Sequence, residues 1–170
     1  TSGKTITIED NAAGISDDRF QDAFKAGKII ERRKNKNSSL GEFNMGMKAA
    51  SYWFTETWKV VTKSIDENKT KMVKMNKNNI VNKSSNLDIY EAKNNSKRGF
   101  TKIFLTNCKR SISARQFEKI RETISSIHRE FLRRDIVSIK FNDQNIKFTE
   151  PEFKKTYPFK EYKNWLDTYK

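Results

Sequence analysis

The sequence has few of the residues that build disulfide-stapled or metal-bound folds. Its 170 residues include one cysteine, Cys108, and one histidine, His128. A disulfide needs two cysteines, and a zinc site takes three or four nitrogen, sulfur or oxygen ligands, most often from Cys and His. We therefore expect neither a disulfide framework nor a metal site built from protein side chains alone. A reducing compartment, the cytoplasm, is the natural location for such a chain.

Long apolar runs are also absent. No stretch reaches the roughly 18 apolar residues that cross a bilayer, and no cleavable signal precedes the first predicted strand. We therefore expect no membrane segment. The length suits one sizeable core, with room for an appendage.

Positive charge is in excess, with 35 Lys and Arg against 21 Asp and Glu and a formal net charge of +14. Clustered Lys and Arg neutralise phosphates and release counterions, so nucleic acid is a candidate partner. Two regions could bind it: the segment 28–36 and a lysine stripe at Lys69, Lys71, Lys74 and Lys77. Alternatively, Lys and Asn are abundant throughout and form no dedicated binding face.

Strands are predicted where polar and apolar residues alternate, or where β-branched and aromatic residues gather. The first, at 5–8, runs directly into an acidic loop at 10–15. The other predicted strands lie at 58–62, 72–75, 87–92 and 99–105.

Two helices are predicted within the first half of the chain. Ser16, followed by two aspartates, starts a helix at about 17–25 with an apolar stripe that includes Phe20 and Phe24. A second helix begins near Asn44. Apolar residues cover most of its circumference, so we expect it to be buried against a sheet rather than half solvated.

The last part of the chain, 111–170, is expected to form a C-terminal extension. Ser113 caps a long helix whose apolar residues, from Phe117 to Phe131, recur every three or four positions. We expect this helix to pack across a sheet, because the repeat is too short for a coiled coil. A hairpin then turns at 142–144.

A glycine-bearing segment stands directly before the second helix. Gly41 and Gly46 leave the backbone without a Cβ where an anion could approach, and the helix start would aim unpaired N–H groups at it. Asn44 is among the few non-glycine residues that adopt a positive φ at modest cost. We interpret the segment as a phosphate cradle, with an ordinary glycine turn as the alternative.

The basic segment before this cradle, 28–40, has no period that could bury a face. It contains Arg32, Arg33 and Lys34 and ends where the glycine loop begins. We interpret it as a mobile, positively charged lid over a phosphate site, with a solvated linker as the alternative.

Three of these stretches together resemble the GHKL ATPase superfamily, which includes gyrase, the heat-shock ninety chaperones, histidine kinases and mismatch-repair ATPases. Residues 10–14 are similar to its D-x-G-x-G motif, 41–48 to G-x-F-G-x-G-x-K, and 99–101 to a Gly-x-Thr strand. The order agrees, and the resemblance covers about residues 5–107. It implies a nucleotide-binding domain at 1–110 with the α/β fold called Bergerat-type: a two-layer α/β sandwich with helices over one face of a mixed sheet.

The resemblance also implies roles for individual residues. Asp10 would accept a hydrogen bond from the adenine amino group, Gly14 would let the base approach the backbone, and Thr101 would lie beside Asp10. ATP with Mg²⁺ is the implied ligand, and dimerisation is a common response to it in the superfamily. The implied ATP-binding residues are Asp10, Asn11, Gly14, Ile15, Gly41, Phe43, Asn44, Met45, Gly46, Lys48 and Thr101.

Two departures from the family pattern matter. Ala12 and Asn44 stand where the family has glycines, which tightens the approach of a ligand to the backbone. The family's first motif, a helix with a Glu that activates water and an Asn that holds Mg²⁺, has no counterpart before the first strand. We expect either a fragment that lacks the upstream helix, or the loss of that helix, or a non-hydrolysing relative. We therefore expect ATP binding with very slow hydrolysis by this chain. A histidine kinase core is disfavoured, because His128 lies downstream of the nucleotide motifs.

Overall fold

The computed structural model describes residues 4–24, 46–78, 87–110 and 112–149. The chain divides into two compact units, Thr1–Ser111 (unit 1) and Ile112–Lys170 (unit 2).

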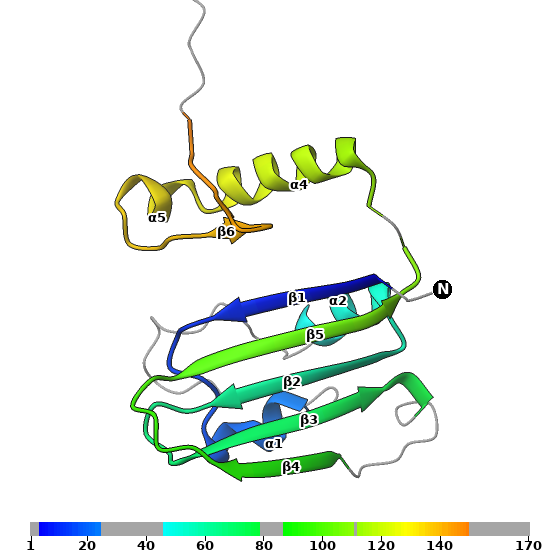
Figure 1. The fold of residues 1–170 in the computed structure, drawn as a ribbon, viewed down its shortest axis with the longest axis vertical. Coiled ribbons are helices and arrows are strands. Elements are labelled where there is room, and N and C mark those ends of the chain that lie inside the picture. The colour runs from blue at the N-terminus through cyan, green and yellow to red at the C-terminus, as the bar shows by residue number, and fades with distance from the viewer. Residues whose placement is uncertain (1–3, 25–45, 79–86, 111, 150–170) are drawn as a thin grey trace, which may run out of the picture. The chain divides into compact units, whose positions relative to one another are not determined.

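Unit 1 is built on a five-stranded sheet with the strand order β1-β5-β2-β3-β4 (Figure 1). All five predicted strands are confirmed. The four pairings between them are all antiparallel, so the described sheet is antiparallel where a mixed one was expected. The strands are β1 (Lys4–Asp10), β2 (Thr57–Lys63), β3 (Lys69–Asn76), β4 (Asp88–Lys93) and β5 (Phe100–Cys108).

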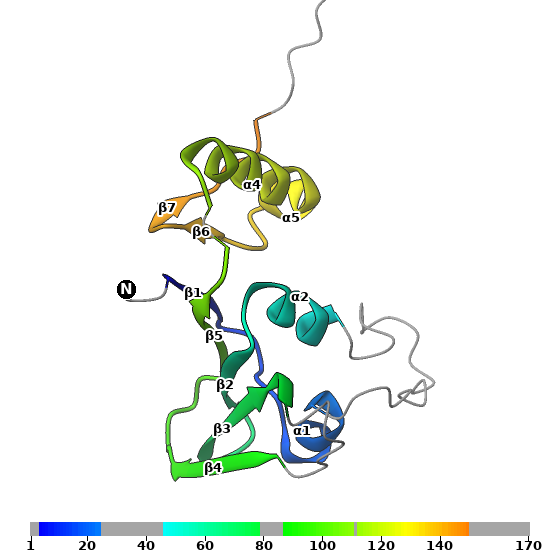
Figure 2. The same cartoon turned by 90° about the vertical axis from the view of Figure 1, so that its right-hand side faces the viewer.

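Two helices, α1 (Asp17–Phe24) and α2 (Gly46–Phe54), lie on the same face of this sheet (Figure 2). This confirms the two-layer α/β class. α1 begins where Ser16 and the two aspartates predicted a helix start.

The core lies between the helices and the sheet. Val60 and Val73 are directly paired on β2 and β3, and neither is exposed. Phe20 and Phe24 of α1 close the core, with their ring centroids 5.0 Å apart. Full burial of one such side chain contributes roughly 1.5–3 kcal/mol, so this layer contact holds α1 on the sheet.

The prediction that α2 is buried around its circumference is wrong. Trp53 is 62% exposed, and Ala49 and Ala50 are exposed as well, whereas Lys48 and Ser51 are buried. A helix on a sheet turns one side toward it. Here that side includes a lysine, whose apolar stem can be buried.

Unit 2 contains a helix pair and a small hairpin (Figure 1). α4 (Ala114–Ile127) starts with a capping box between Ser113 and Gln116, as the predicted cap requires. α5 (Arg129–Arg133) follows after one residue. The hairpin pairs β6 (Lys140–Phe141) with β7 (Gln144–Asn145), and its two turn residues both have positive φ values.

α4 contacts the hairpin segment at Phe117 in its first turn and at Ser125 in its last turn. The rings of Phe117 and Phe141 lie 5.6 Å apart, and the Ser125 hydroxyl donates to the Lys147 carbonyl at 2.9 Å. The predicted helix through Phe131 is instead interrupted at residue 128, and Ile127 is 69% exposed. The second half of the apolar stripe is therefore not buried among the described residues.

Candidate functional site

A row of three polar side chains crosses the sheet at the end of β1. Asp10 is paired with Thr101 on β5, and Thr101 is paired with Thr62 on β2. Directly paired residues of antiparallel strands point to the same face, with Cβ atoms roughly 4.5–5.5 Å apart. Thr62 is two residues beyond the core residue Val60, so the row lies on the helix-covered face.

The carboxylate of Asp10 shapes the loop that follows it. Its Oδ1 accepts a hydrogen bond from the backbone N–H of Ala12 at 3.0 Å. This contact across two residues is typical of an Asx turn. The Asp10 side chain is exposed, so the carboxylate can also meet a ligand from solvent.

Thr62 is the residue at this site that sequence reasoning missed. It is fully buried, accepts a hydrogen bond from the N–H of Ile15 at 3.0 Å and donates one to the carbonyl of Phe100 at 3.0 Å. Its hydroxyl also lies 3.2 Å from that of Thr101. Thr62 therefore ties the acidic loop to two strands. One signal in the sequence could have identified Thr62: it is a polar residue at a strand position where the alternation of faces predicts a buried side chain.

Two glycines allow the loop to lie directly on the sheet. Gly14 has a φ of +73°, and a Cβ there would lie 1.9 Å from the Lys63 carbonyl oxygen. A Cβ on Gly99 would lie 2.5 Å from the Ala12 carbonyl oxygen. The need for glycine at position 14 thus arises from packing inside the protein, before any ligand is considered.

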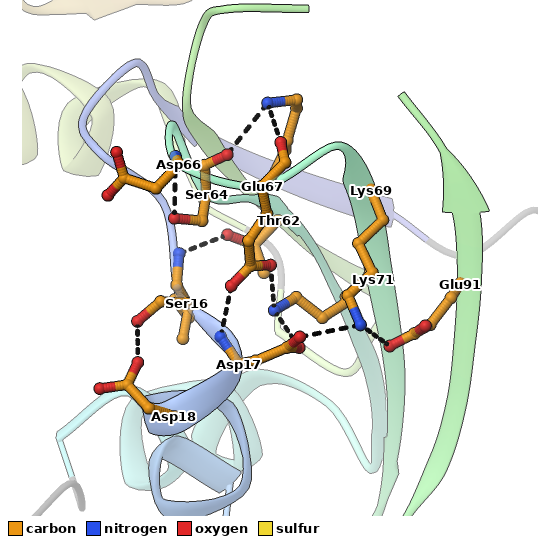
Figure 3. A network of polar contacts seen from close by, with 12 residues as sticks. Ser16, Asp17, Asp18, Thr62, Ser64, Asp66, Glu67, Lys69, Lys71 and Glu91 are labelled. Atoms are coloured by element: carbon orange, nitrogen blue, oxygen red, sulfur yellow. Dashed lines mark hydrogen bonds and ion pairs between the residues drawn. The ribbon is translucent and has the colours of Figure 1, made fainter. Parts of the chain in front are cut away.

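An ionic network fixes the first turn of α1 to the sheet beside this loop (Figure 3). The Lys71 Nζ lies 2.7 Å from both an Asp17 carboxylate oxygen and a Glu67 carboxylate oxygen. Lys69 Nζ lies 2.9 Å from Asp17 and from Glu91. The backbone N–H of Asp17 donates to Glu67 at 2.6 Å.

This network alters the titration of its members. Hydrogen bonds from Lys69 and then Lys71 lower the pKa of Asp17 below its usual value. Hydrogen bonds to Asp17 and Glu91 raise the pKa of Lys69. Lys71 is only 1% exposed and is paired with two carboxylates, as a buried charge requires.

The start of α2 contributes two of the predicted phosphate-binding residues. Gly46 is exposed, and a Cβ there would meet no atom of the described residues within 4 Å. Lys48, 3% exposed, has a pKa lowered by burial. Of the other predicted residues, Asn11 is exposed in the loop and Ile15 is half-buried against the core. The remaining ones lie outside the described residues: Gly41, Phe43, Asn44 and Met45, and the lid residues Arg32, Arg33 and Lys34.

The predicted lysine stripe does not form one free surface. Lys69 and Lys71 are held by carboxylates on the helix-covered face, whereas Lys74 lies on the opposite face with its Nζ 5.1 Å from the centre of the Tyr90 ring. Alternation along β3 separates them. The segment 28–36 lies outside the described residues, so nucleic-acid binding there stays a prediction.

Within the described part of the chain, no group of three or more His, Cys, Asp or Glu side chains could hold a metal ion. In the same residues, no helix is long and apolar enough to span a membrane.

A comparison with protein families matches residues 1–104 to the histidine kinase-, DNA gyrase B- and HSP90-like ATPases. The match covers more than half of the chain and includes Asp10, Thr62 and Thr101. The chain belongs to this family. The resemblance seen in the sequence motifs is thereby confirmed, and membership supports an ATP-binding domain.

Solved structures similar to the chain include ATPase regions from three organisms. The Aquifex aeolicus MutL ATPase domain complexed with ADP is 11% identical, with a TM-score of 0.47 over 86% of this chain and 53% of that one. The ATPase region of Saccharomyces cerevisiae topoisomerase II is 13% identical, with a TM-score of 0.48 over 97% of this chain and 43% of that one.

The third comes from Balamuthia mandrillaris and contains the ATPase and transducer domains of DNA topoisomerase II. It is 13% identical, with a TM-score of 0.41 over 61% of this chain and 28% of that one. The chain thus spans about half the length of the MutL structure and less of the other two. Among curated proteins, none matches the chain.

Proposed function

We propose that unit 1 binds an adenine nucleotide at the row formed by Asp10, Thr101 and Thr62. The observation that carries this proposal is the direct pairing of Asp10 with Thr101 beside a loop held in place by Thr62. A carboxylate and a hydroxyl placed side by side offer hydrogen-bond acceptors to an amino group, and adenine carries one on its ring.

The acidic loop would form the rest of the base site. Ile15 is half-buried against the core and offers apolar contact to a flat ring, while Asn11 is exposed at the loop surface. Gly14 turns this loop onto the sheet, so the backbone on either side of it is close to the row.

The phosphates are assigned to the start of α2 and the glycine segment before it. Among the described residues, the open surroundings of Gly46 leave room for an anion beside the first N–H groups of α2. Lys48 is 3% exposed, so its assignment to this site rests on the sequence motif. Gly41, Phe43, Asn44 and Met45 would wrap the phosphate chain, an assignment that rests on the sequence motif. Mg²⁺ would bind with the triphosphate, whose charge it would offset.

A nucleotide-dependent change is proposed for the chain that follows α1. Because Asp17 ties the first turn of α1 to Lys69 and Lys71 of β3, that turn is anchored to the sheet. We therefore place any ligand-dependent movement after Phe24, in the segment that contains Arg32, Arg33 and Lys34. Closure of this segment over the phosphates, and dimerisation that depends on it, would make the domain a nucleotide-dependent switch.

The test is the substitution Asp10→Asn. Asparagine keeps an oxygen that can accept from Ala12, so the loop is retained, but it replaces the second acceptor by an N–H donor. We expect ATP affinity to fall by about 10- to 100-fold, because a mispaired polar group costs about 1–3 kcal/mol. Calorimetric titration with a non-hydrolysable ATP analogue and Mg²⁺ measures this.

Asp88→Asn is the matched control. Asp88 is an exposed strand residue on β4, at the far edge of the sheet from β1, and its substitution changes the charge by the same amount. It should leave the affinity unchanged. If Asp10→Asn binds the analogue as tightly as the parent chain does, the base site lies elsewhere.

A further inference from the structure

Three contacts converge on the buried hydroxyl of Thr62. Its Oγ1 lies 3.0 Å from the backbone nitrogen of Ile15, 3.0 Å from the carbonyl oxygen of Phe100 and 3.2 Å from the hydroxyl oxygen of Thr101. Thr62 is 0% exposed, so bulk water is not in contact with this hydroxyl. All three contacts therefore have to be satisfied within the protein.

Counting protons fixes the direction of each bond. A hydroxyl donates one proton and accepts at two lone pairs. The amide of Ile15 can only donate, and the carbonyl of Phe100 can only accept. Thr62 therefore gives its one proton to Phe100, accepts from Ile15 and has one lone pair left, which completes the third contact when Thr101 donates to it.

The proton of Thr101 is then committed to Thr62. For any further partner the Thr101 hydroxyl has only lone pairs to offer, and the neighbouring Asp10 carboxylate also accepts only. The two paired residues thus form a surface of acceptors without a donor. From this we infer that Thr62, by orienting the hydroxyl of Thr101, makes the site selective for a ligand that presents an amino group rather than a keto group.

This inference rests on the proposed function of the same row and adds its specificity. Adenine carries an amino group at the ring position where inosine carries a keto oxygen. The two protons of the amino group can pair with the two acceptors. A keto oxygen in the same place pairs with neither, and the one ring N–H of inosine beside it reaches an acceptor only if the base shifts. Sites built around such hydrogen bonds discriminate more strongly than apolar pockets do.

The experiment compares dissociation constants for ATP and inosine triphosphate, measured by calorimetric titration of the 170-residue chain and its variants. The parent chain should bind ATP about tenfold or more tightly than inosine triphosphate, because an unpaired polar group is costly. Thr62→Val keeps the side-chain shape but removes the hydroxyl, which frees Thr101 to turn its proton outward. The preference should then fall, with the part that depends on the Asp10 carboxylate retained, and inosine triphosphate should bind more tightly than it does to the parent chain.

Two variants serve as controls. Thr62→Ser keeps the hydroxyl and should keep the preference. Thr55→Val removes another buried hydroxyl, one that accepts from the N–H of Thr57 and donates to the Thr106 carbonyl, at a residue that is 2% exposed. It should lower the melting temperature, as Thr62→Val does, without changing the nucleotide preference.

Thr101→Val provides an independent route if Thr62→Val does not fold. It removes the oriented hydroxyl itself, so ATP binding should weaken and the preference should fall as well. Suppose that the parent chain prefers ATP, and that Thr101→Val keeps this preference, as does Thr62→Val if it folds. The role of Thr62 is then overturned, while the proposed function stands. Equal binding of both nucleotides by the parent overturns the acceptor-only surface, and binding of neither contradicts the proposed function itself.

Discussion

At the scale of single residues, the backbone of Gly14 decides whether the acidic loop can reach the sheet. Its φ of +73° is unfavourable for other residues, and the carbonyl of Lys63 occupies the place of a Cβ. The N–H of the next residue, Ile15, reaches Thr62 only because the chain turns here. The position of the loop therefore depends on the absence of a side chain at Gly14.

We predict that Gly14→Ala destabilises unit 1 by more than about 2 kcal/mol, since it combines backbone strain with a backbone clash. Urea denaturation followed by circular dichroism measures the loss. Gly46→Ala is the control, because a Cβ there meets no atom within 4 Å in the described part of the chain and alanine favours a helix. The control should be neutral or slightly stabilising, and equal losses in both variants would contradict the packing argument.

The sequence identified the site residues that belong to a recognisable motif. It could not identify a residue whose role depends only on where the fold places it. Asp10 and Thr101 were predicted side by side from two separate motifs, and the strand register pairs them. Thr62 belongs to no motif and was missed, whereas Lys48 was predicted from the second glycine motif but without its burial. Their burial depends on which strand and loop lie against them, and this is settled only by tertiary packing.

At the scale of elements, α1 is anchored electrostatically at its first turn and by apolar contacts further along. Asp17 is held by Lys69 and Lys71, while Phe20 and Phe24 enter the core. The helix dipole adds to this, because acidic residues stabilise the N-terminal turn of a helix.

The anchoring predicts a dependence of stability on pH. The pKa of Asp17 is lower in the folded protein than in the unfolded chain, so its contribution is present above the unfolded value of about 3.9 and is lost as the pH falls through the folded value. Asp17→Asn should therefore lower the free energy of unfolding at pH 7, by about 1 kcal/mol or less given the exposure of this side chain. It should also reduce the loss of stability below about pH 4.

The measurement is urea denaturation between pH 3 and pH 7. Asp88→Asn is again the control, and it should leave the acid-dependent loss close to that of the parent chain. If Asp17→Asn and the parent chain lose the same stability on acidification, other carboxylates dominate and the network contributes little to folding.

The elements themselves were more predictable than their burial. Alternating polarity located the strands at 5–8 and 99–105, and β-branched and aromatic residues located the other three strands of unit 1. The composition of α2 could not show that Trp53 would be exposed, because apolar residues around a whole helix leave its orientation undetermined. Similarly, the apolar stripe of α4 suggested one continuous buried face, but the helix ends at Ile127 with that side chain exposed.

At the scale of the whole molecule, the proposed site and the main core both belong to unit 1. Every buried residue of the core cluster, from Phe20 to Leu105, lies before residue 112. The buried Ile146 belongs to unit 2. The family match also ends within unit 1, at residue 104. The two units therefore differ in what they contribute, and the second is not required to complete the first core.

This division predicts that a fragment comprising residues 1–111 folds alone and binds the ATP analogue with the same dissociation constant as the 170-residue chain. A chain of that length with its own core is within the range of independent domains. The measurement combines thermal unfolding with the calorimetric titration used for Asp10→Asn. The same substitution in the fragment should weaken binding as strongly as in the longer chain, because the row of Asp10, Thr101 and Thr62 is entirely retained. A fragment that lacks a cooperative unfolding transition would show that unit 2 stabilises unit 1, and a folded fragment that no longer binds the analogue would show that residues beyond 111 complete the site.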